Sequence, residues 1–443
     1  MVLISTTNRL QVQIVFYPST LAQIPCPTRG PHQTARRPHC LTIALIILSL
    51  FLALGSRAAT QAAEADSPAE IVLGMSTVLT GNAGDLGKDM QRGIQAGLER
   101  ANRNGGVNGR KLRLITLDDG YEPTRTAPNM RQLIEKDNVL AVIGNAGTPT
   151  AIVSVPLANE QKPLLFAPFS GGPILRNNPP DRYVINYRAG YAEETAAMID
   201  ALIDIAGLKP QEIAFFTQRD SYGDAGFILG MTALRRHGST DPRTILHVGY
   251  ERNTLAVETA VANLLMAENP PRAVVMVGAY APCAKFIRLC RETDLSPLFL
   301  NVSFVGGSSL AEALGKTDAR IIVTQVVPSP SDDSVPIVRE YQDDLKDIDY
   351  AASAGFGDLE GYIAARILTL ALQNIEGSPT REAVVDALEG LGNFDIGLGE
   401  TLYLSRKEHQ ASHRVWPTIL RGGQFVPFQW TDITALTKGD APP

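Results

Sequence analysis

The sequence predicts an α/β protein with two doubly wound lobes, parallel central sheets and a ligand cleft between the lobes. Three observations support this fold class. Short apolar runs alternate with stretches of helical spacing, a pattern typical of parallel sheets covered by helices on both faces. The runs number about ten, more than one open sheet of a mid-sized domain usually holds. No low-complexity linker divides the series, so two lobes joined by several crossings fit better than two separate domains.

The expected strands follow one another from Ile71 to Val327. Helical spacing separates them and is clearest at residues 86–102, 191–205 and 255–267. In such folds ligands bind outside the carboxyl ends of the strands, so binding residues are expected there. The strands are expected at residues 71–78, 111–117, 139–144, 163–168, 182–186, 212–217, 243–250, 273–278, 297–303 and 320–327.

The amino-terminal segment differs from the rest of the chain. Residues 1–57 contain five arginines and no acidic residue, and residues 41–54 are apolar except for Thr42 and Ser49. A membrane-spanning helix needs about 20 apolar residues, so this run is short. A positive segment, a short apolar core and small residues after it are typical of an export signal, with a retained anchor as the alternative. We therefore expect residues 1–65 to be a leader and the mature protein to be exported.

The composition is that of a globular protein. The 443 residues, 44% of them hydrophobic, are enough for two domains. Beyond residue 57, 35 basic side chains face 46 acidic ones, a formal charge of −11 that argues against a nucleic-acid partner. Cys283 and Cys290 lie in one expected helix about 10 Å apart in rise, too far to bridge within it. They are interpreted as core residues, and no metal or disulfide framework is expected.

One small-residue turn predicts an anion seat. In "VIGNAGTPTA" an expected strand ends at Ile143, small residues follow, and Thr148 is expected to cap a helix with Pro149 at its first position. Open amides, a hydroxyl and the positive helix end suit a carboxylate. The glycine spacing of a dinucleotide loop and the lysine of a nucleotide loop are both missing. A plain helix cap with nothing bound is the alternative.

A second turn and four tyrosines extend this candidate site. "FAPFSGGP" follows the next strand and offers Ser170 and Gly171, with the same chemistry of a hydroxyl and close backbone approach. Aromatic side chains that also carry a hydroxyl can stack on a small solute and bond to it. Those at corresponding positions along the chain are Tyr121, Tyr191, Tyr222 and Tyr280, although any single one is more often a core or surface residue.

Several segments, taken in order, resemble a known family. They are "IVLGMSTVLTG", "ANRNGGVNGRKLRLITLDDGYEP", "VIGNAGTPTA", "LLFAPFSGGP" and "RDSYGDAG". The chain resembles the type I periplasmic solute-binding proteins of the branched-chain amino-acid (Leu/Ile/Val) binding kind from Ala69 to about Trp430. This resemblance implies a two-lobed clamp that closes on a small polar solute and delivers it to an ABC-type permease in the inner membrane.

The resemblance also implies roles for individual residues. The solute carboxylate would meet Thr148 and the group around Ser170 and Gly171, and Tyr222 and Tyr280 would come from the second lobe. Leu86 stands where relatives have a large aromatic residue, which implies a roomier pocket. Tyr121 and Gly147 stand where some relatives have a disulfide, and that staple is absent here.

Ser303 is the departure from the family that matters most. Relatives that bind leucine-like amino acids place a glutamate there to meet the ammonium. A buried ammonium without a carboxylate costs several kcal/mol. Either another acid reaches into the site or the solute has no ammonium, so carboxylates, amides and aromatic acids stay open.

Two other classes of function are the alternatives. For an enzyme, no Ser/His/acid or Cys/His set gathers around the motifs, and no catalytic residue or cofactor is expected. His409 and His413 have the spacing of a metal pair on a helix but no third ligand nearby, so a loop interaction is the preferred interpretation. A soluble periplasmic sensor for a membrane signalling receptor is the second alternative.

The resulting organisation is a hinged monomer. Lobe 1 is expected at residues 69–187 and 329–404, and lobe 2 at residues 188–328 and 405–443. Three hinge crossings are expected near Tyr187, near Pro328 and before Trp416. Solute contacts from both lobes would favour the closed form.

Overall fold

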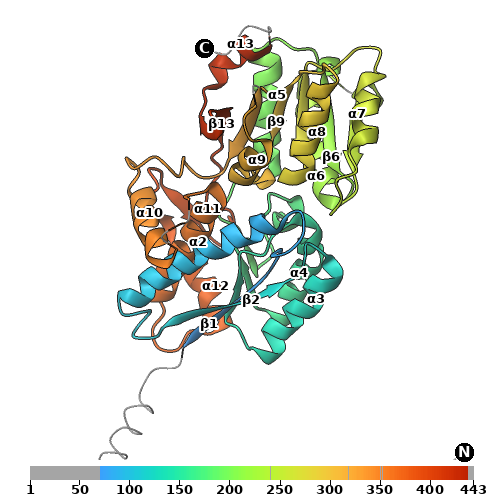
Figure 1. Cartoon of the computed structure of the whole chain (residues 1–443). Helices are drawn as coiled ribbons and strands as arrows, with labels where there is room; N and C mark the ends of the chain where they lie inside the picture. Colours follow the sequence, from blue (N-terminus) through green and yellow to red (C-terminus); the bar gives the residue numbers. More distant parts are fainter. Residues whose placement is uncertain (1–69, 240, 318, 350, 352, 438–443) are drawn as a thin grey trace, which may run out of the picture. The chain divides into compact units, whose positions relative to one another are not determined.

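The computed structural model describes residues 70–239, 241–317, 319–349, 351 and 353–437. The expected leader at residues 1–65 lies outside the described residues. Residues 68–443 form one compact unit, as expected for lobes joined by more than one crossing. Two large sheets organise this unit (Figure 1).

The first sheet has five parallel strands in the order β2-β1-β3-β4-β5. Its central strands are buried because helices cover the sheet, as their apolar sequences require. β3 and β4 are direct neighbours, with Val142 paired to Leu165, so the loops that follow them start side by side. The strands are β1 Ile71–Thr77, β2 Leu112–Asp118, β3 Ala141–Ile143, β4 Leu164–Phe166 and β5 Val184–Ile185.

The second sheet has seven strands in the order β14-β13-β10-β9-β8-β6-β7. Its parallel strands are β6 Ile213–Gln218, β7 His247–Tyr250, β8 Ala273–Val277, β9 Leu298–Asn301 and β10 Ile321–Gln325. The hairpin β13 Trp416–Arg421 and β14 Gln424–Pro427 adds two antiparallel strands at one edge. The sheet is therefore mixed. A separate two-stranded ribbon pairs β11 Gly392–Phe394 with β12 Leu402–Leu404.

The helices alternate with the strands through most of the chain. In chain order they are α2 Gly84–Arg103, α3 Pro123–Arg131, α4 Thr148–Gln161, α5 Tyr191–Asp200, α6 Ser221–Arg236, α7 Glu258–Leu265, α8 Tyr280–Glu292, α9 Gly307–Leu314, α10 Pro336–Ile348, α11 Phe356–Gln373, α12 Arg381–Glu389 and α13 Ile433–Thr437. None of the helices in this described part of the chain is long and apolar enough to cross a membrane.

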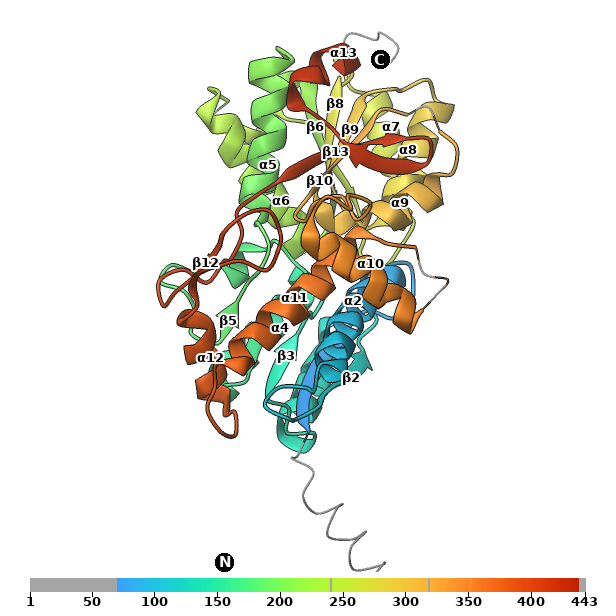
Figure 2. The same cartoon turned by 90° about the vertical axis from the view of Figure 1, so that its left-hand side faces the viewer.

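The chain passes between the two sheets three times, after β5, after β10 and after β12. The second crossing returns the chain to the first lobe, where α11 lies alongside α2 (Figure 2). This contact is very close, because a Cβ on Gly93 of α2 would lie 1.7 Å from the carbonyl oxygen of Asp358 in α11. The three crossings are confirmed, whereas the residue boundaries of the lobes remain a proposal.

All ten expected strands are confirmed, and the four strands β11 to β14 were missed. β13 and β14 contain Pro417 and Pro427, which reduce the strand signal but are tolerated at a sheet edge. The expected helix at 191–205 ends in a π-helical turn, Ala201–Ile205. Cys283 and Cys290 are buried in α8, and burial raises the pKa of the Cys290 thiol to about 12, as expected for core residues.

Candidate functional site

Two hydroxyls meet at the carboxyl ends of neighbouring strands. Thr148 follows β3 and Ser170 follows β4, and their side-chain oxygens lie 2.8 Å apart in a buried contact. The amide of Gly172 donates to the Ser170 Oγ at 3.1 Å. The structure thus brings together the two hydroxyls that the sequence assigns to one anion seat. We call Thr148, Ser170 and the Gly171 backbone the hydroxyl seat.

The turn before α4 begins one residue earlier than expected. Gly147, not Thr148, is the capping residue, and Thr148 is the first residue of the helix. Gly147 has φ +103°, which side-chain-bearing residues rarely adopt, and a Cβ there would lie 2.2 Å from the Tyr121 ring. The Tyr121 ring therefore packs directly on Gly147, and these are the two positions that the family resemblance aligns with a disulfide in some relatives.

Tyr191 supplies a buried hydroxyl without a hydrogen-bond partner among the described residues. Its backbone amide donates to the carbonyl of Gly171 at 2.9 Å, and a Cβ on Gly171 would lie 2.4 Å from its ring. Burial raises the pKa of Tyr191, while the positive charge of Arg188 and, after it, the polar groups of Ser170, Gly171 and Thr148 oppose that rise. The hydroxyl is therefore a protonated donor beside the hydroxyl seat, available to an acceptor on a bound solute.

Tyr121 and Tyr222 approach the same region from the two lobes. The Tyr121 hydroxyl lies 3.5 Å from the Gln218 Nε2 of lobe 2. The Tyr222 ring centre lies 5.4 Å from that of Tyr191, and its hydroxyl donates to the Gly278 carbonyl at 3.4 Å. Burial raises the pKa of both phenols well above 10, so both are neutral donors. The structure thus places Tyr121 and Tyr222 close to Tyr191, and their role in binding a solute stays a prediction.

Phe304 is a site residue that sequence reasoning missed. It lies in a 3-10 turn after β9 and is fully buried. Its ring centre lies 5.0 Å from Tyr222, 5.3 Å from Phe169 and 6.0 Å from Tyr121. We call these four side chains the ring cluster. The signal was present in the sequence, because Phe169 precedes Ser170 and Phe304 follows Ser303 at two strand ends.

A buried carboxylate lies next to Ser303. The carboxylate of Glu194, on α5, accepts hydrogen bonds from the Ser303 amide at 2.7 Å and from its Oγ at 2.9 Å. Thr324 donates to the same carboxylate at 2.6 Å, and Arg188 donates at 3.2 Å. Burial raises the pKa of Glu194, while Arg188 and these donors lower it. An acid from another part of the chain, Glu194, therefore reaches Ser303, but all four of its hydrogen bonds are to protein groups.

Arg188 is a fully buried cation on the first crossing. Its guanidinium donates to Ser303, lies 3.4 Å from the Glu360 carboxylate and lies 5.4 Å from the centre of the Phe169 ring. Burial raises the pKa of Glu360 to about 7, against the effect of Arg188. Arg176 lies behind this group and donates to the Arg188 carbonyl at 2.9 Å. Arg188 thus connects the crossing with both lobes.

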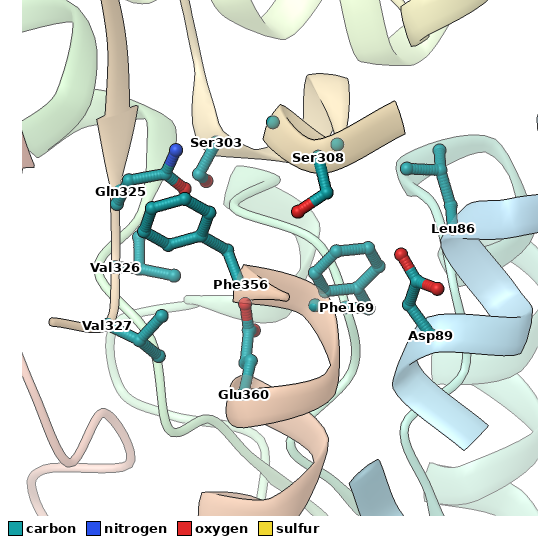
Figure 3. A pocket seen from close by; sticks show the side chains of 13 residues that line it. Leu86, Asp89, Phe169, Ser303, Ser308, Gln325, Val326, Val327, Phe356 and Glu360 are labelled. Atoms are coloured by element: carbon teal, nitrogen blue, oxygen red, sulfur yellow. The ribbon is translucent and has the colours of Figure 1, made fainter. Parts of the chain in front are cut away.

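A pocket between the lobes adjoins the ring cluster (Figure 3). From lobe 1, Asp89, Phe169 and Glu360 line it, and from lobe 2 it is lined by Ser303 and Gln325, among others. The space open to the centre of a water-sized sphere is about 10 Å³, room for about one water molecule. In this arrangement the lobes leave too little room for a solute, so entry requires them to separate.

Leu86 and Tyr280 lie at the α2 side of this pocket, not in the hydroxyl seat. A Cβ on Gly306 would lie 2.5 Å from Leu86 and 3.8 Å from Tyr280. The Tyr280 hydroxyl donates to Asp85 of α2 at 2.9 Å, and burial and that carboxylate raise its pKa. Leu86 therefore packs against lobe 2, and the roomier pocket expected from its size is not seen in this arrangement.

The two histidines near the third crossing are not on a helix, contrary to the spacing pattern. His409 Nδ1 lies 3.0 Å from the Val184 carbonyl, and His413 Nδ1 lies 2.9 Å from Glu193. The Glu193 carboxylate raises the pKa of His413. Both histidines hold the crossing segment to the lobes, as the preferred interpretation has it, and they do not face a common point.

A second acidic group offers no better metal site. Asp200, Asp204 and His237 lie close together. The two ring nitrogens of His237 face different carboxylates, at 2.8 Å and 3.4 Å, and Arg236 also bonds to Asp200. The group pairs charges instead of directing ligands toward one ion.

Two hinged lobes, a hydroxyl seat at the strand ends of one and aromatic side chains from both define a class of protein, a two-lobed solute-binding protein. The sequence profile of the family described as periplasmic binding protein matches residues 70–424. The chain belongs to this family, whose members are substrate-binding proteins.

Individual relatives agree with this assignment. A crystal structure titled a possible leucine/isoleucine/valine-binding protein from Rhodopirellula baltica SH 1 is 48% identical, with a TM-score of 0.80, covering 82% of this chain and 97% of that one. The Leu/Ile/Val-binding protein homolog 7 of Brucella abortus is 27% identical over 78% of this chain and 86% of its own length. An amino acid binding protein of Pseudomonas aeruginosa is 22% identical over 56% of this chain, and the match spans 64% of that relative's length.

Proposed function

We propose that the protein is the periplasmic substrate-binding component of an ABC-type uptake transporter of the branched-chain amino-acid kind, and that it encloses a small carboxylate- or amide-bearing solute. The observation that carries this proposal is the hydroxyl seat, in which Thr148 and Ser170 lie close to the buried Tyr191 hydroxyl, which has no hydrogen-bond partner within the described part of the chain. Uncharged donors that are shielded from water bind an anionic oxygen strongly. The names of the Rhodopirellula and Brucella relatives support the same class of solute.

Closure of the lobes is the proposed mechanism. Lobe 1 comprises residues 69–187 and 329–404, and lobe 2 comprises residues 188–328 and 405–443. Tyr222 belongs to lobe 2 and Thr148 to lobe 1, so a solute that touches both makes its full set of contacts only when the lobes are closed. The proposed partners are the solute and an ABC permease, and the proposed form is an exported monomer.

A solute screen tests this function. A solute that binds the folded form raises its melting temperature, so amino acids, short amides, 2-oxo acids and aromatic acids are compared by thermal shift. For the best solute, Thr148→Ala and Tyr222→Ala should each weaken calorimetric affinity by roughly 1 to 3 kcal/mol, because a polar group of the complex loses its partner.

Ser154→Ala is the matched control for these variants. Ser154 lies on α4, is buried like Thr148, and donates to the Thr150 carbonyl within the helix. Its removal should affect stability but not affinity. Unchanged affinity in both Thr148→Ala and Tyr222→Ala would count against the hydroxyl seat.

A further inference from the structure

We propose that the solute is a monocarboxylate with an apolar, uncharged body and no ammonium group, and that Phe304 determines the size of that body. This inference rests on the proposed function, because it concerns the same site. It follows from what surrounds the hydroxyl seat and from which charges are already paired there.

The surroundings of the seat are aromatic. The Tyr191 ring lies against the Gly171 backbone of the hydroxyl seat and 5.4 Å from the Tyr222 ring. Within the ring cluster, Phe304 packs on Phe169 at 5.3 Å between ring centres. Tyr222 and Tyr121 complete the ring cluster, and all four side chains are buried. A solute whose carboxylate lies in the seat therefore presents its other end to ring faces, which favour an apolar or aromatic group.

Phe304 occupies the space that this body needs. It belongs to lobe 2 and packs against Phe169 and Tyr121 of lobe 1, so its contacts to these rings break when the lobes separate. The adjoining pocket has room for about one water molecule. A solute body consequently lies between Phe304 and the lobe-1 rings, and the bulk of Phe304 limits its size.

An ammonium finds no free carboxylate beside the seat. In an α-amino acid the ammonium is one carbon away from the carboxylate, so its acceptor must lie near Thr148 and Ser170. Glu194 is the acid that reaches Ser303, and it already accepts four hydrogen bonds. A carboxylate offers about four lone-pair positions, so Glu194 has none left.

The two acids that line the interlobe pocket are also paired. Glu360 faces Arg188 at 3.4 Å, and Asp89 accepts a hydrogen bond from Arg92 at 2.9 Å. The Arg188 guanidinium lies 5.4 Å from the Phe169 ring centre, so the cation position at this ring is already taken. A solute without an ammonium avoids this unpaired charge.

The test compares solutes that differ in one group. Leucine and 4-methylpentanoate differ only by the ammonium, and 3-phenylpropanoate has a larger body than 4-methylpentanoate. By calorimetry on the full-length protein, 4-methylpentanoate should bind about tenfold or more tighter than leucine, since only leucine carries a charge without a partner. Phe304→Ala should shift the affinity ratio of 3-phenylpropanoate to 4-methylpentanoate upward by about tenfold, because the larger body fills the vacated volume.

Phe286→Ala is the control for the loss of a buried ring. Phe286 stacks on Phe216 in the core of lobe 2, so its loss should lower the melting temperature and leave the ratio unchanged. Phe304→Leu retains most of the packing and should give an intermediate ratio.

Each contrary outcome has a distinct meaning. Leucine binding as tightly as 4-methylpentanoate would overturn the absence of an ammonium while leaving the proposed function intact. An unchanged ratio in both Phe304 variants would overturn the role of Phe304. No binding by any of the three probes would overturn the inference as a whole, and failure of the wider solute screen would then overturn the proposed function as well.

Discussion

At the scale of single residues, the Tyr191 hydroxyl departs from the usual pairing of polar groups in protein interiors. Buried polar groups nearly always have a partner, and leaving one unpaired costs about 1 to 3 kcal/mol. This hydroxyl is fully buried beside Ser170 and Thr148 and has no partner among the described residues. A bound solute that accepts a hydrogen bond from this hydroxyl would recover this free energy on binding.

Tyr191→Phe should therefore separate stability from binding. Removing the hydroxyl should leave the free protein as stable as before or more stable by about 1 kcal/mol, because an unpaired polar group is lost. Affinity for the solute should fall by a similar amount. Urea denaturation measures the first effect and calorimetry the second, with a loss of stability and unchanged affinity as the contradicting result.

Glu360 makes stability depend on pH. Burial raises its pKa from 4.5 to about 7, with Arg188 opposing and Glu194 adding to the shift. The folded state therefore binds this proton more tightly than the unfolded state does. The resulting stabilisation is complete below about pH 4.5 and is lost as the pH rises through about 7. Burial raises the pKa of Asp89 to about 6, which acts in the same direction.

Glu360→Gln should flatten this dependence. Between about pH 5 and about pH 7.5, the wild-type free energy of unfolding should fall by about 2.4 kcal/mol more than that of the variant. Denaturant titrations at both pH values measure the difference. Glu99→Gln, at an exposed position of α2, is the control and should keep the wild-type slope. Equal slopes for wild type and Glu360→Gln would show that this carboxyl titrates normally.

At the scale of elements, the pairing of α2 with α11 holds the returning chain to lobe 1. The helices approach so closely that Gly93 has no space for a side chain. Ion pairs from the same helix reach α10, where Asp344 accepts from Arg100 at 3.2 Å and from the Tyr362 hydroxyl of α11 at 2.6 Å. Gly93 thus allows the close approach of α2 to α11, and Asp344 ties α10 to both helices.

Gly93→Val should disrupt this helix pair. The new Cβ would overlap the Asp358 carbonyl, and overpacking of this kind costs about 3 kcal/mol or more. Gln95→Val places the same side chain at an exposed position of α2 and serves as the control. The midpoint of thermal unfolding measures both. A Gly93→Val protein as stable as Gln95→Val would show that the helices can separate without cost.

At the scale of the whole molecule, polar contacts outside the hydroxyl seat join the lobes. Arg252 of lobe 2 lies 2.8 Å from Glu122 of lobe 1, and Asn253 donates to the same carboxylate at 2.7 Å. The Tyr280 contact with Asp85 is of the same kind. These groups are partly exposed, so each is expected to contribute about 1 kcal/mol or less to the closed arrangement.

Arg252→Ala should favour the open arrangement in the absence of solute. The radius of gyration from small-angle X-ray scattering should rise, because about 0.5 to 1 kcal/mol of closing energy is lost. Arg219→Ala is the control, since Arg219 pairs with Glu251 inside lobe 2. Addition of solute should bring Arg252→Ala back to the compact form. Equal radii for both variants would mean that this contact does not bias closure.

Periodicity was sufficient for the parallel core of the fold. Most of the ten parallel strands are buried, so each is a short apolar run in the sequence whatever its neighbours are. The hairpin of β13 and β14 lies at an edge and includes two prolines, and β11 and β12 are three residues each, so none of them carries a strong pattern. The capping residue of α4 is Gly147, one residue before the predicted Thr148, because caps depend on local backbone angles.

The sequence by itself determined the α/β class, the order of the strands and the hydroxyls at the ends of β3 and β4, because apolar period and turn chemistry are local properties of the chain. Only the tertiary structure decided that Glu194 reaches Ser303, that Arg188 takes up its charge and that Phe304 closes the ring cluster. These contacts join residues more than a hundred positions apart, except for Arg188 and Glu194, and no local pattern encodes which of them meet.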